Sequence, residues 1–252
     1  MKIVAVIPAY NVEKTLDKTL AAIPSGVVDE VIVVNDGSRD ETAAIAERHG
    51  VILVNHPVNQ GYGAAQKTGY QTALQRGADV AVMLHADFQY DPTLLPGVIQ
   101  PLIEGKADVC FGSRMSNRRS ARAGGMPLWR FVPNIVLSWI EDSVFQLGLS
   151  EYHTGYRAYS RPILERIPFV KNSDNYVFDT EMFAQIALAG VRTAEIPIPT
   201  RYFKEASSPN FWKSVQYGLS TLSVVIKFIL HRHGYITIPR FVVRPAGEPA
   251  KL

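Results

Sequence analysis

Three short apolar runs near the start of the chain each end in a turn of polar side chains. Lys2–Ile7 leads into Pro8-Ala9-Tyr10-Asn11, Glu30–Val34 into Asn35-Asp36-Gly37-Ser38, and Val80–Leu84 into His85-Ala86-Asp87-Phe88-Gln89. Apolar runs of this length, bounded by turn residues, are typical of buried strands. Because parallel strands end at one edge of a sheet, the three turns should lie together and suit a divalent cation and a nucleotide diphosphate.

Segments with helical periodicity separate these strands. The predicted helices cover Val12–Ile23, Asp40–Arg48, Gly63–Gln75 and Pro92–Ile103, and two more strands are expected at Val51–Val54 and Ala107–Gly112. Regular alternation of strand and helix is typical of an α/β fold. The chain is therefore expected to form a mainly parallel sheet with helices on both faces.

The second half of the chain is less regular. Helices are predicted at Asn134–Leu147 and Phe178–Leu188, and a short extended segment at Gly155–Tyr159. Thr193–Ile198 is predicted to be an edge strand, because Pro197 cannot donate to a ladder.

One long apolar helix is predicted from about Asn210. Its uncharged stretch between Lys213 and Lys227 has 13 residues, fewer than the roughly 20 that span a bilayer. We therefore predict one domain over residues 1–209. Residues 210–252 are expected to form a helix and tail that pack on this domain, on a partner subunit in a homo-oligomer, or on a membrane surface.

Composition limits the class of protein. Hydrophobic residues make up 47% of the 252 residues, enough for a large core, and the net charge of +3 is too small to indicate a nucleic-acid partner. That charge fits an anionic small substrate or an anionic membrane surface. A single cysteine, Cys110, excludes an intramolecular disulfide. The first strand begins at Lys2, which leaves no room for a signal peptide, so a cytoplasmic location is expected, with contact to the inner face of the membrane as an option.

The three turns occur in a fixed order with further motifs. These are Asn59-Gln60-Gly61-Tyr62-Gly63-Ala64, Gly112-Ser113-Arg114, Thr154-Gly155-Tyr156-Arg157-Ala158, Phe178-Asp179-Thr180-Glu181-Met182 and Glu195-Ile196-Pro197. Together they resemble the family 2 glycosyltransferases, which have the Rossmann-like GT-A fold, and in particular the branch related to dolichol-phosphate mannose synthases. The resemblance covers about residues 2–205.

The resemblance implies a metal-dependent, inverting glycosyltransferase. Such an enzyme moves a sugar from a nucleoside-diphosphate sugar, with UDP or GDP as the nucleotide, to a polyprenyl phosphate or a glycan. The resemblance also implies which residues bind the nucleotide: Pro8, Tyr10, Asn11, Asp36, Gly61 and Gly63.

The family's metal motif has two aspartates and a glutamine, and the chain departs from it. Asp87 and Gln89 match the second Asp and the Gln, whereas His85 stands at the first Asp. His85 could ligate Mn²⁺, since imidazole is a competent ligand, or could instead donate a hydrogen bond to the sugar. A second departure is Asn35, at the usual first Asp of an Asp-Asp-Gly-Ser turn. The expected cofactor is Mn²⁺ or Mg²⁺.

Two carboxylates are candidates for the general base that a hydroxyl acceptor needs. Asp179 and Glu181 are two residues apart on a predicted helix, about 200° around its axis, so they cannot both face one site. Glu181 aligns with the family pattern, and Asp179 suits capping of the helix start. A phosphate acceptor, already anionic, needs no base. Arg114, Arg157 and Arg201 are candidates for phosphate contact, Arg114 also for catalysis.

The acceptor is left open by the sequence. The arginine-rich loop at residues 118–122 and the apolar C-terminal helix favour a polyprenyl phosphate, whereas the lack of a full membrane span favours a glycan hydroxyl. Two other classes compete with a transferase: a non-catalytic nucleotide-sugar binder with a degenerate metal motif, and a sugar-1-phosphate nucleotidyltransferase. The latter needs a glycine-rich basic loop after the first strand, and Pro8-Ala9-Tyr10-Asn11 is not one.

Overall fold

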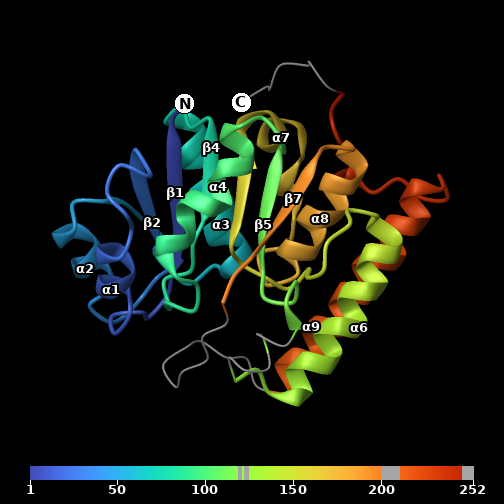
Figure 1. The fold of residues 1–252 in the computed structure, drawn as a ribbon, viewed down its shortest axis with the longest axis horizontal. Coiled ribbons are helices and arrows are strands. Elements are labelled where there is room, and N and C mark those ends of the chain that lie inside the picture. Colours follow the sequence, from blue (N-terminus) through green and yellow to red (C-terminus); the bar gives the residue numbers. More distant parts are fainter. Residues whose placement is uncertain (119–120, 122–124, 200–210, 246–252) are drawn as a thin grey trace.

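A computed structural model describes residues 1–118, 121, 125–199 and 211–245, the side chains of Phe211 and Lys213 excepted. Within these residues a seven-stranded sheet forms the centre of the molecule (Figure 1). Its strands are β1 (Ile3–Ala9), β2 (Glu30–Asn35), β3 (Ile52–Asn55), β4 (Val80–Met83), β5 (Val109–Ser113), β6 (Arg157–Ser160) and β7 (Thr193–Pro197). Their order across the sheet is β3-β2-β1-β4-β6-β5-β7.

The sheet is mostly parallel, with one strand reversed. β6 runs antiparallel to both β4 and β5, and the other neighbouring pairs are parallel. The predicted α/β class with a mainly parallel sheet is therefore confirmed, and β7 lies at an edge as Pro197 indicated. Because β1, β2 and β4 are parallel neighbours, the three polar turns that follow them share one edge of the sheet.

Helices cover both faces of the sheet. One face carries α1 (Leu16–Ala21), α2 (Thr42–Arg48) and α4 (Leu95–Ile103), and the other carries α3 (Tyr62–Gln75), α7 (Arg161–Arg166) and α8 (Phe178–Ala189). Each layer has its own hydrophobic core against the sheet. In α3, a Cβ on Gly69 would lie 2.2 Å from Val6 Cγ1, so this glycine lets the helix approach the sheet closely.

Two long helices, α6 (Leu128–Phe145) and α9 (Phe211–Arg232), lie side by side beyond α8 (Figure 1). α6 begins at Leu128 rather than at the predicted Asn134 and contains Pro133, whose ring is exposed on the helix surface. α9 matches the helix expected from about Asn210. Its buried Val224, Val225 and Phe228 join the core, whereas other apolar side chains of the helix are exposed. No helix in the described residues combines the length and apolarity needed to cross a membrane.

The described part of the tail after α9 packs on the domain. Phe241, in the 3-10 turn η3 (Pro239–Phe241), is buried in the core beneath α8. The Arg240 carbonyl accepts a hydrogen bond from Gln185 of α8 at 2.7 Å. The contacts of Arg240 and Phe241 are therefore made with the domain itself, which is one of the three packing surfaces predicted for residues 210–252.

Candidate active site

The turns after β1 and β2 are joined by hydrogen bonds at the sheet edge. The Asn11 N–H donates to Ser38 Oγ at 3.0 Å, and the Arg39 N–H donates to Asn11 Oδ1 at 2.9 Å. Asn11 adopts φ 51°, a left-handed conformation that Asn tolerates better than most residues. Pro8 lies in β1 beside Val34, and the Tyr10 side chain, 48% exposed, stands at this edge. The exposed side chains of the first motif at this edge are therefore those of Tyr10 and Asn11.

Asp36 organises a loop. Its buried carboxylate accepts hydrogen bonds from His56 Nδ1 at 2.6 Å, the Gln60 N–H at 2.8 Å and the Gly61 N–H at 2.9 Å. The sequence predicted Asp36 as a nucleotide ligand and did not single out His56. These contacts make Asp36 the residue that holds the loop at 56–61 against the second turn.

Gly61 and Gly63 are close to another part of the chain. A Cβ on Gly61 would lie 2.4 Å from the Asp174 carbonyl oxygen, and one on Gly63 would lie 2.3 Å from the Ser173 carbonyl oxygen. The Gly63 N–H donates to Asp174 O at 2.7 Å. The two glycines therefore let this loop approach the Ser173–Asp174 backbone closely, and their contact with a nucleotide stays a prediction.

The turn after β4 holds the predicted metal ligands. Asp87, only 7% exposed, accepts a hydrogen bond from the Gln89 N–H at 3.1 Å and forms no ion pair with the described residues. Phe88 between them has φ 59°, a conformation that bulky residues rarely adopt and that costs about 1 kcal/mol or more. Nowhere in the described part of the chain do three or more His, Cys, Asp or Glu side chains cluster as a metal site. The candidate ligands in this turn are therefore the Asp87 carboxylate and the Gln89 amide side chain.

His85 is turned toward the protein interior. Its Nε2 lies 3.0 Å from the Tyr62 hydroxyl, and its ring meets Tyr90 edge-on at 5.1 Å between centroids. A Cβ on Gly155 would lie 2.0 Å from Nε2, which explains the glycine of the Thr154-Gly155-Tyr156 motif. Burial lowers the pKa of His85, and the nearby Asp87 and Asp179 carboxylates oppose this shift.

Asp179 lies at the centre of a buried polar cluster. It forms an ion pair with Arg157 Nη1 at 2.8 Å and accepts hydrogen bonds from Gln66 at 2.9 Å and the Tyr62 hydroxyl at 3.3 Å. Arg157 has no exposed surface, and its Nε donates to the Thr154 carbonyl at 2.7 Å. The sequence predicted Arg157 as a phosphate ligand; the structure corrects this, because a fully buried guanidinium cannot reach a bound phosphate.

Three polar side chains on one side of α3 belong to this buried cluster. They were not predicted from the sequence. Tyr62, Gln66 and Tyr70 recur every four residues, and the Tyr70 hydroxyl donates to Gln66 Oε1 at 3.0 Å. Polar side chains at helical spacing within a buried helix are the signal that could have identified this face.

Glu181 faces away from Asp179, as their spacing predicted. Its carboxylate accepts from the Ser173 N–H at 2.6 Å and the Ser173 hydroxyl at 2.9 Å, and it forms an ion pair with Arg240. These contacts tie α8 to the loop at 173 and to η3. The sequence considered Glu181 as a general base, whereas the structure gives it this tethering role.

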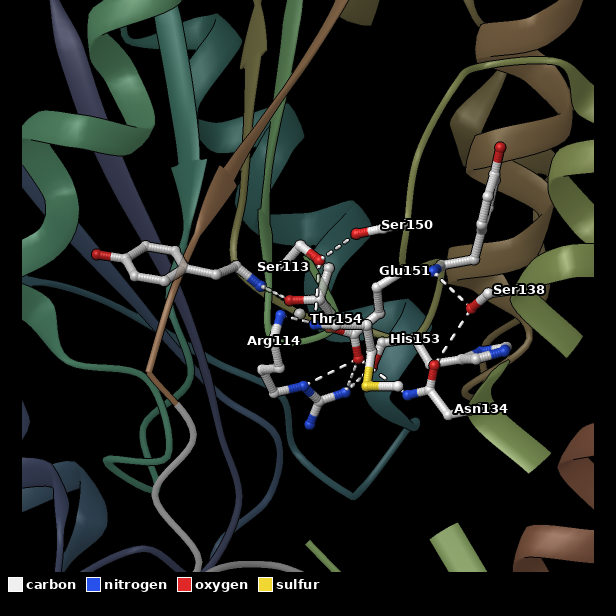
Figure 2. Close-up of polar contacts among 12 residues, drawn as sticks. Ser113, Arg114, Asn134, Ser138, Ser150, Glu151, His153 and Thr154 are labelled. Carbon is white, nitrogen blue, oxygen red and sulfur yellow. Dashed lines mark hydrogen bonds and ion pairs between the residues drawn. The ribbon is translucent and has the colours of Figure 1, made fainter. Parts of the chain in front are cut away.

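Arg114, at the end of β5, is held by Glu151 (Figure 2). Its Nε donates to Glu151 Oε1 at 2.9 Å, its backbone N–H donates to Oε2 at 2.6 Å, and Nη2 also donates to the His153 carbonyl at 2.7 Å. Asn134 of α6 donates to the same carboxylate at 2.9 Å. Burial alone would raise the pKa of Glu151, but the Arg114 guanidinium and the Asn134 amide hold it below its usual value.

Two further contacts fix this corner of the site. Glu195 of the Glu195-Ile196-Pro197 motif accepts hydrogen bonds from the Ser150 N–H at 2.9 Å and the Ser150 hydroxyl at 2.7 Å. The Tyr90 ring lies against both His85 and the Arg114 guanidinium, which is 6.0 Å from its centroid. The Tyr90 ring therefore lies between Arg114 and His85, the first residue of the turn after β4. Arg201, the third predicted phosphate ligand, lies outside the described residues.

Comparison with known families identifies this arrangement. A model described as glycosyl transferase family 2 matches residues 4–168, which include β1 to β6 and the sheet-edge turns. The chain belongs to this family. It is a glycosyltransferase, and the nucleotidyltransferase and non-catalytic alternatives are set aside.

Named relatives place this family 2 glycosyltransferase near the predicted branch. It is 31% identical over 214 residues to a UDP-N-acetylglucosamine–dolichyl-phosphate N-acetylglucosaminyltransferase of Methanococcus voltae, covering 78% of this chain and 84% of the relative. It is 30% identical over 209 residues to an undecaprenyl-phosphate mannosyltransferase of Micrococcus luteus, covering 79% and 83%. The resemblance to the branch related to dolichol-phosphate mannose synthases is confirmed.

A solved structure supports the fold. Glucosyl-3-phosphoglycerate synthase from Mycobacterium tuberculosis, in complex with Mn²⁺, uridine diphosphate and phosphoglyceric acid, matches with a TM-score of 0.68 and 21% sequence identity. The match covers 92% of this chain and 78% of that chain. At this identity the likeness extends to the fold alone.

The Arg114–Glu151 pair predicts a large effect on stability. We expect Glu151→Gln to lower the free energy of unfolding by about 3 kcal/mol at neutral pH, because the variant leaves a largely buried guanidinium unpaired. Since the pKa of Glu151 is lowered in the folded state, the difference from wild type should shrink as acid protonates this carboxylate. Urea unfolding at neutral and at acidic pH measures the free energy of unfolding of both proteins and its dependence on pH.

A matched control is Glu165→Gln, which removes the half-exposed i,i+4 ion pair with Arg161 on α7. We expect this variant to lose less than about 0.5 kcal/mol, because exposed helix pairs contribute little. Equal losses in the two variants would contradict the special role of Glu151.

Proposed function

We propose that this glycosyltransferase moves a sugar from a nucleoside-diphosphate sugar to a polyprenyl phosphate. The observation that carries the choice of acceptor is the engagement of both candidate bases by protein partners. Protonating Asp179 would leave the fully buried Arg157 unpaired, and such a buried charge is costly. Glu181 is engaged by Ser173 and Arg240. A phosphate acceptor is already an anion and needs neither residue as a base.

The named relatives support the same acceptor. Those of M. voltae and M. luteus carry dolichyl phosphate and undecaprenyl phosphate in their names, and both align over more than three quarters of this chain. In this proposal an oxygen of the acceptor phosphate forms a bond to the anomeric carbon while the bond from that carbon to the nucleoside diphosphate breaks. Attack from the opposite face inverts the configuration.

The donor is proposed to lie across the turns after β1, β2 and β4. Tyr10 would cover the base, and the loop held by Asp36 would line the ribose side. Asp87 and Gln89 offer the oxygen ligands that suit Mg²⁺ or Mn²⁺ when a diphosphate supplies further ones. The cation, when bound, would stabilise the charge of the departing diphosphate. The neighbour from M. tuberculosis was crystallised with Mn²⁺ and UDP, which supports this assignment.

Arg114 is proposed to meet the acceptor phosphate. Its guanidinium is held in position by Glu151 and the His153 carbonyl, and a fixed planar fork suits a phosphate. Tyr90 lies between Arg114 and the turn after β4, so an acceptor bound at Arg114 would approach the donor from beside Tyr90.

The cytoplasmic location of the protein stays a prediction.

His85 is proposed to position Tyr62 rather than to bind metal. The Tyr62 hydroxyl donates its one proton to Asp179, so its bond to His85 requires Nε2–H to be the donor. With the proton on Nε2 turned toward Tyr62, that nitrogen cannot ligate a cation, so Nδ1 is the ring nitrogen that a cation would need. His85 is therefore the last residue in a series of contacts that runs from Arg157 through Asp179 and Tyr62 to the turn after β4.

Sugar transfer is the direct test of this function. We expect the protein to transfer radiolabelled sugar from a UDP- or GDP-sugar to a polyprenyl phosphate, and Asp87→Asn to lower the rate at least about a hundredfold. Asp91→Asn is the matched control, because Asp91 caps η1 (Pro92–Leu94) through Thr93 only a turn further on. Transfer to free saccharides but not to polyprenyl phosphate would overturn the acceptor assignment.

Metal affinity tests the role of His85. We expect His85→Gln to keep the affinity for Mn²⁺ in the presence of UDP or GDP within about threefold, because the metal ligands Asp87 and Gln89 remain. Electron paramagnetic resonance of free Mn²⁺ measures this affinity directly. A loss of tenfold or more, similar to the loss in Asp87→Asn, would make His85 a ligand after all.

A further inference from the structure

The loop at residues 172–176, which precedes α8, is held by side chains of two helices. Lys67 of α3 forms an ion pair with Asp174 at 2.5 Å and donates to the Asn172 carbonyl at 2.8 Å. Gln185 of α8 exchanges two hydrogen bonds with the Asn172 amide side chain, at 3.1 Å and 2.7 Å. We call this segment the 172–176 loop. These contacts fix its first half relative to α3 and α8.

The C-terminal turn η3 adds a third attachment. Arg240 Nη1 donates to Ser173 Oγ at 3.2 Å, and the same guanidinium pairs with Glu181, which itself accepts from the Ser173 N–H. A short connection between η2 (Phe169–Lys171) and α8 does not need contacts with three separate elements. Their combined effect is to give the loop, and the side chain at its end, one defined position.

The side chain at the end of the loop is an exposed aromatic ring. Tyr176 is 56% exposed, and its ring stacks on the Tyr62 ring, with 5.1 Å between centroids and an interplanar angle of 28°. Because Tyr62 covers one face, the exposed surface of Tyr176 lies on the other face and on the rim. A ring that is fixed on one side and open on the other can stack against a ligand.

The Tyr176 ring lies beside the turn after β4. Tyr62, on which it stacks, is also in contact with His85, the first residue of that turn. Partial burial raises the pKa of Tyr176, and the Asp87 carboxylate adds to this shift, so the two side chains are within electrostatic reach. The open face of the ring therefore belongs to the candidate active site.

The sheet order places this ring on the side of the turn that is away from Tyr10. Tyr10 follows β1, which neighbours β4 on one side, and β6 neighbours β4 on the other. Asp179, three residues after Tyr176, pairs with Arg157 at the start of β6. A donor with its base at Tyr10 and its diphosphate at Asp87 would therefore extend its sugar toward the 172–176 loop.

We propose that Tyr176 is the platform on which the donor sugar stacks, and that the contacts of the 172–176 loop hold this platform in place. A pyranose has faces of C–H groups and a rim of hydroxyls, and a tyrosine offers an apolar ring with one polar hydroxyl to match. The inference rests on the proposed function for the position of the donor. It goes further by assigning one side chain to the sugar and not to the nucleotide or the acceptor.

Calorimetric titration that compares nucleotides with nucleotide-sugars tests the proposal. The full chain in Mn²⁺ would be titrated with UDP, GDP, UDP-glucose, UDP-N-acetylglucosamine and GDP-mannose. We expect Tyr176→Ala to weaken binding of the nucleotide-sugar that wild type prefers about tenfold, and to change the affinity for the free nucleotide less than about threefold. Tyr176→Phe keeps the ring and should bind that nucleotide-sugar within about threefold of wild type.

The control variant is Tyr235→Ala, which removes a tyrosine that is 76% exposed and lies beyond the end of α9. It should bind nucleotide and nucleotide-sugar as wild type does. An unchanged affinity of Tyr176→Ala for the nucleotide-sugar would overturn the proposal. So would an equal loss for nucleotide and nucleotide-sugar, because a contact with the sugar alone affects only the second.

The same titrations separate this inference from the proposed function. No nucleotide binding by wild type would overturn the proposed donor site and this inference with it. Nucleotide binding by wild type without a sugar-specific loss in Tyr176→Ala would overturn this inference alone.

Discussion

The guanidinium of Arg157 has no exposure to water and lies behind the candidate active site. The arrangement of the site depends on the ion pair between Arg157 and Asp179. Arg157 forms an ion pair with Asp179, donates to the Thr154 carbonyl and lies 4.8 Å from the Phe183 ring centroid. Burial disfavours its charge, but Asp179, together with the nearby Tyr159, Tyr62 and Tyr70, raises the pKa of Arg157 above its usual value. The pair joins β6 to α8, and Asp179 also accepts hydrogen bonds from Gln66 and Tyr62 of α3. Tyr62 in turn contacts His85, the first residue of the turn after β4. Removing either partner would leave an uncompensated charge in the interior.

Several charged residues of the family motifs hold loops of the site in place through hydrogen bonds. Asp36 holds the loop at 56–61, Glu181 holds the loop at 173, and Glu195 holds the loop at 150. Asp87 is different, because among the described residues its carboxylate has only the Gln89 N–H as a hydrogen-bond partner. Under the proposed assignment, a chain with His85 in place of an aspartate keeps its donor site because His85 contacts Tyr62 and the proposed ligand Asp87 is retained.

The sequence was sufficient to predict elements whose signals are local. The strand-and-turn pattern located the site edge, and Pro197 identified the edge strand. It was not sufficient where tertiary contacts decide. Nothing local to Arg157–Ser160 predicts that β6 is reversed, and α6 begins before Pro133 although proline usually ends a helix pattern. The candidate site residues could be named from their motifs, but their partners could not, because Arg114 meets Glu151, 37 residues away, and Asp36 meets His56, 20 residues away.

Calorimetric titration of UDP and GDP, each with Mn²⁺ or with EDTA, tests the central claim that this sheet edge is a metal-dependent nucleoside-diphosphate site. We expect one of the two nucleotides to bind in Mn²⁺, and we expect EDTA and Asp87→Ala each to abolish this binding. The nucleotide that binds would also identify the base of the donor. Binding that is equal in EDTA and in Mn²⁺, or no binding of either nucleotide, would contradict the assignment of Asp87 and Gln89.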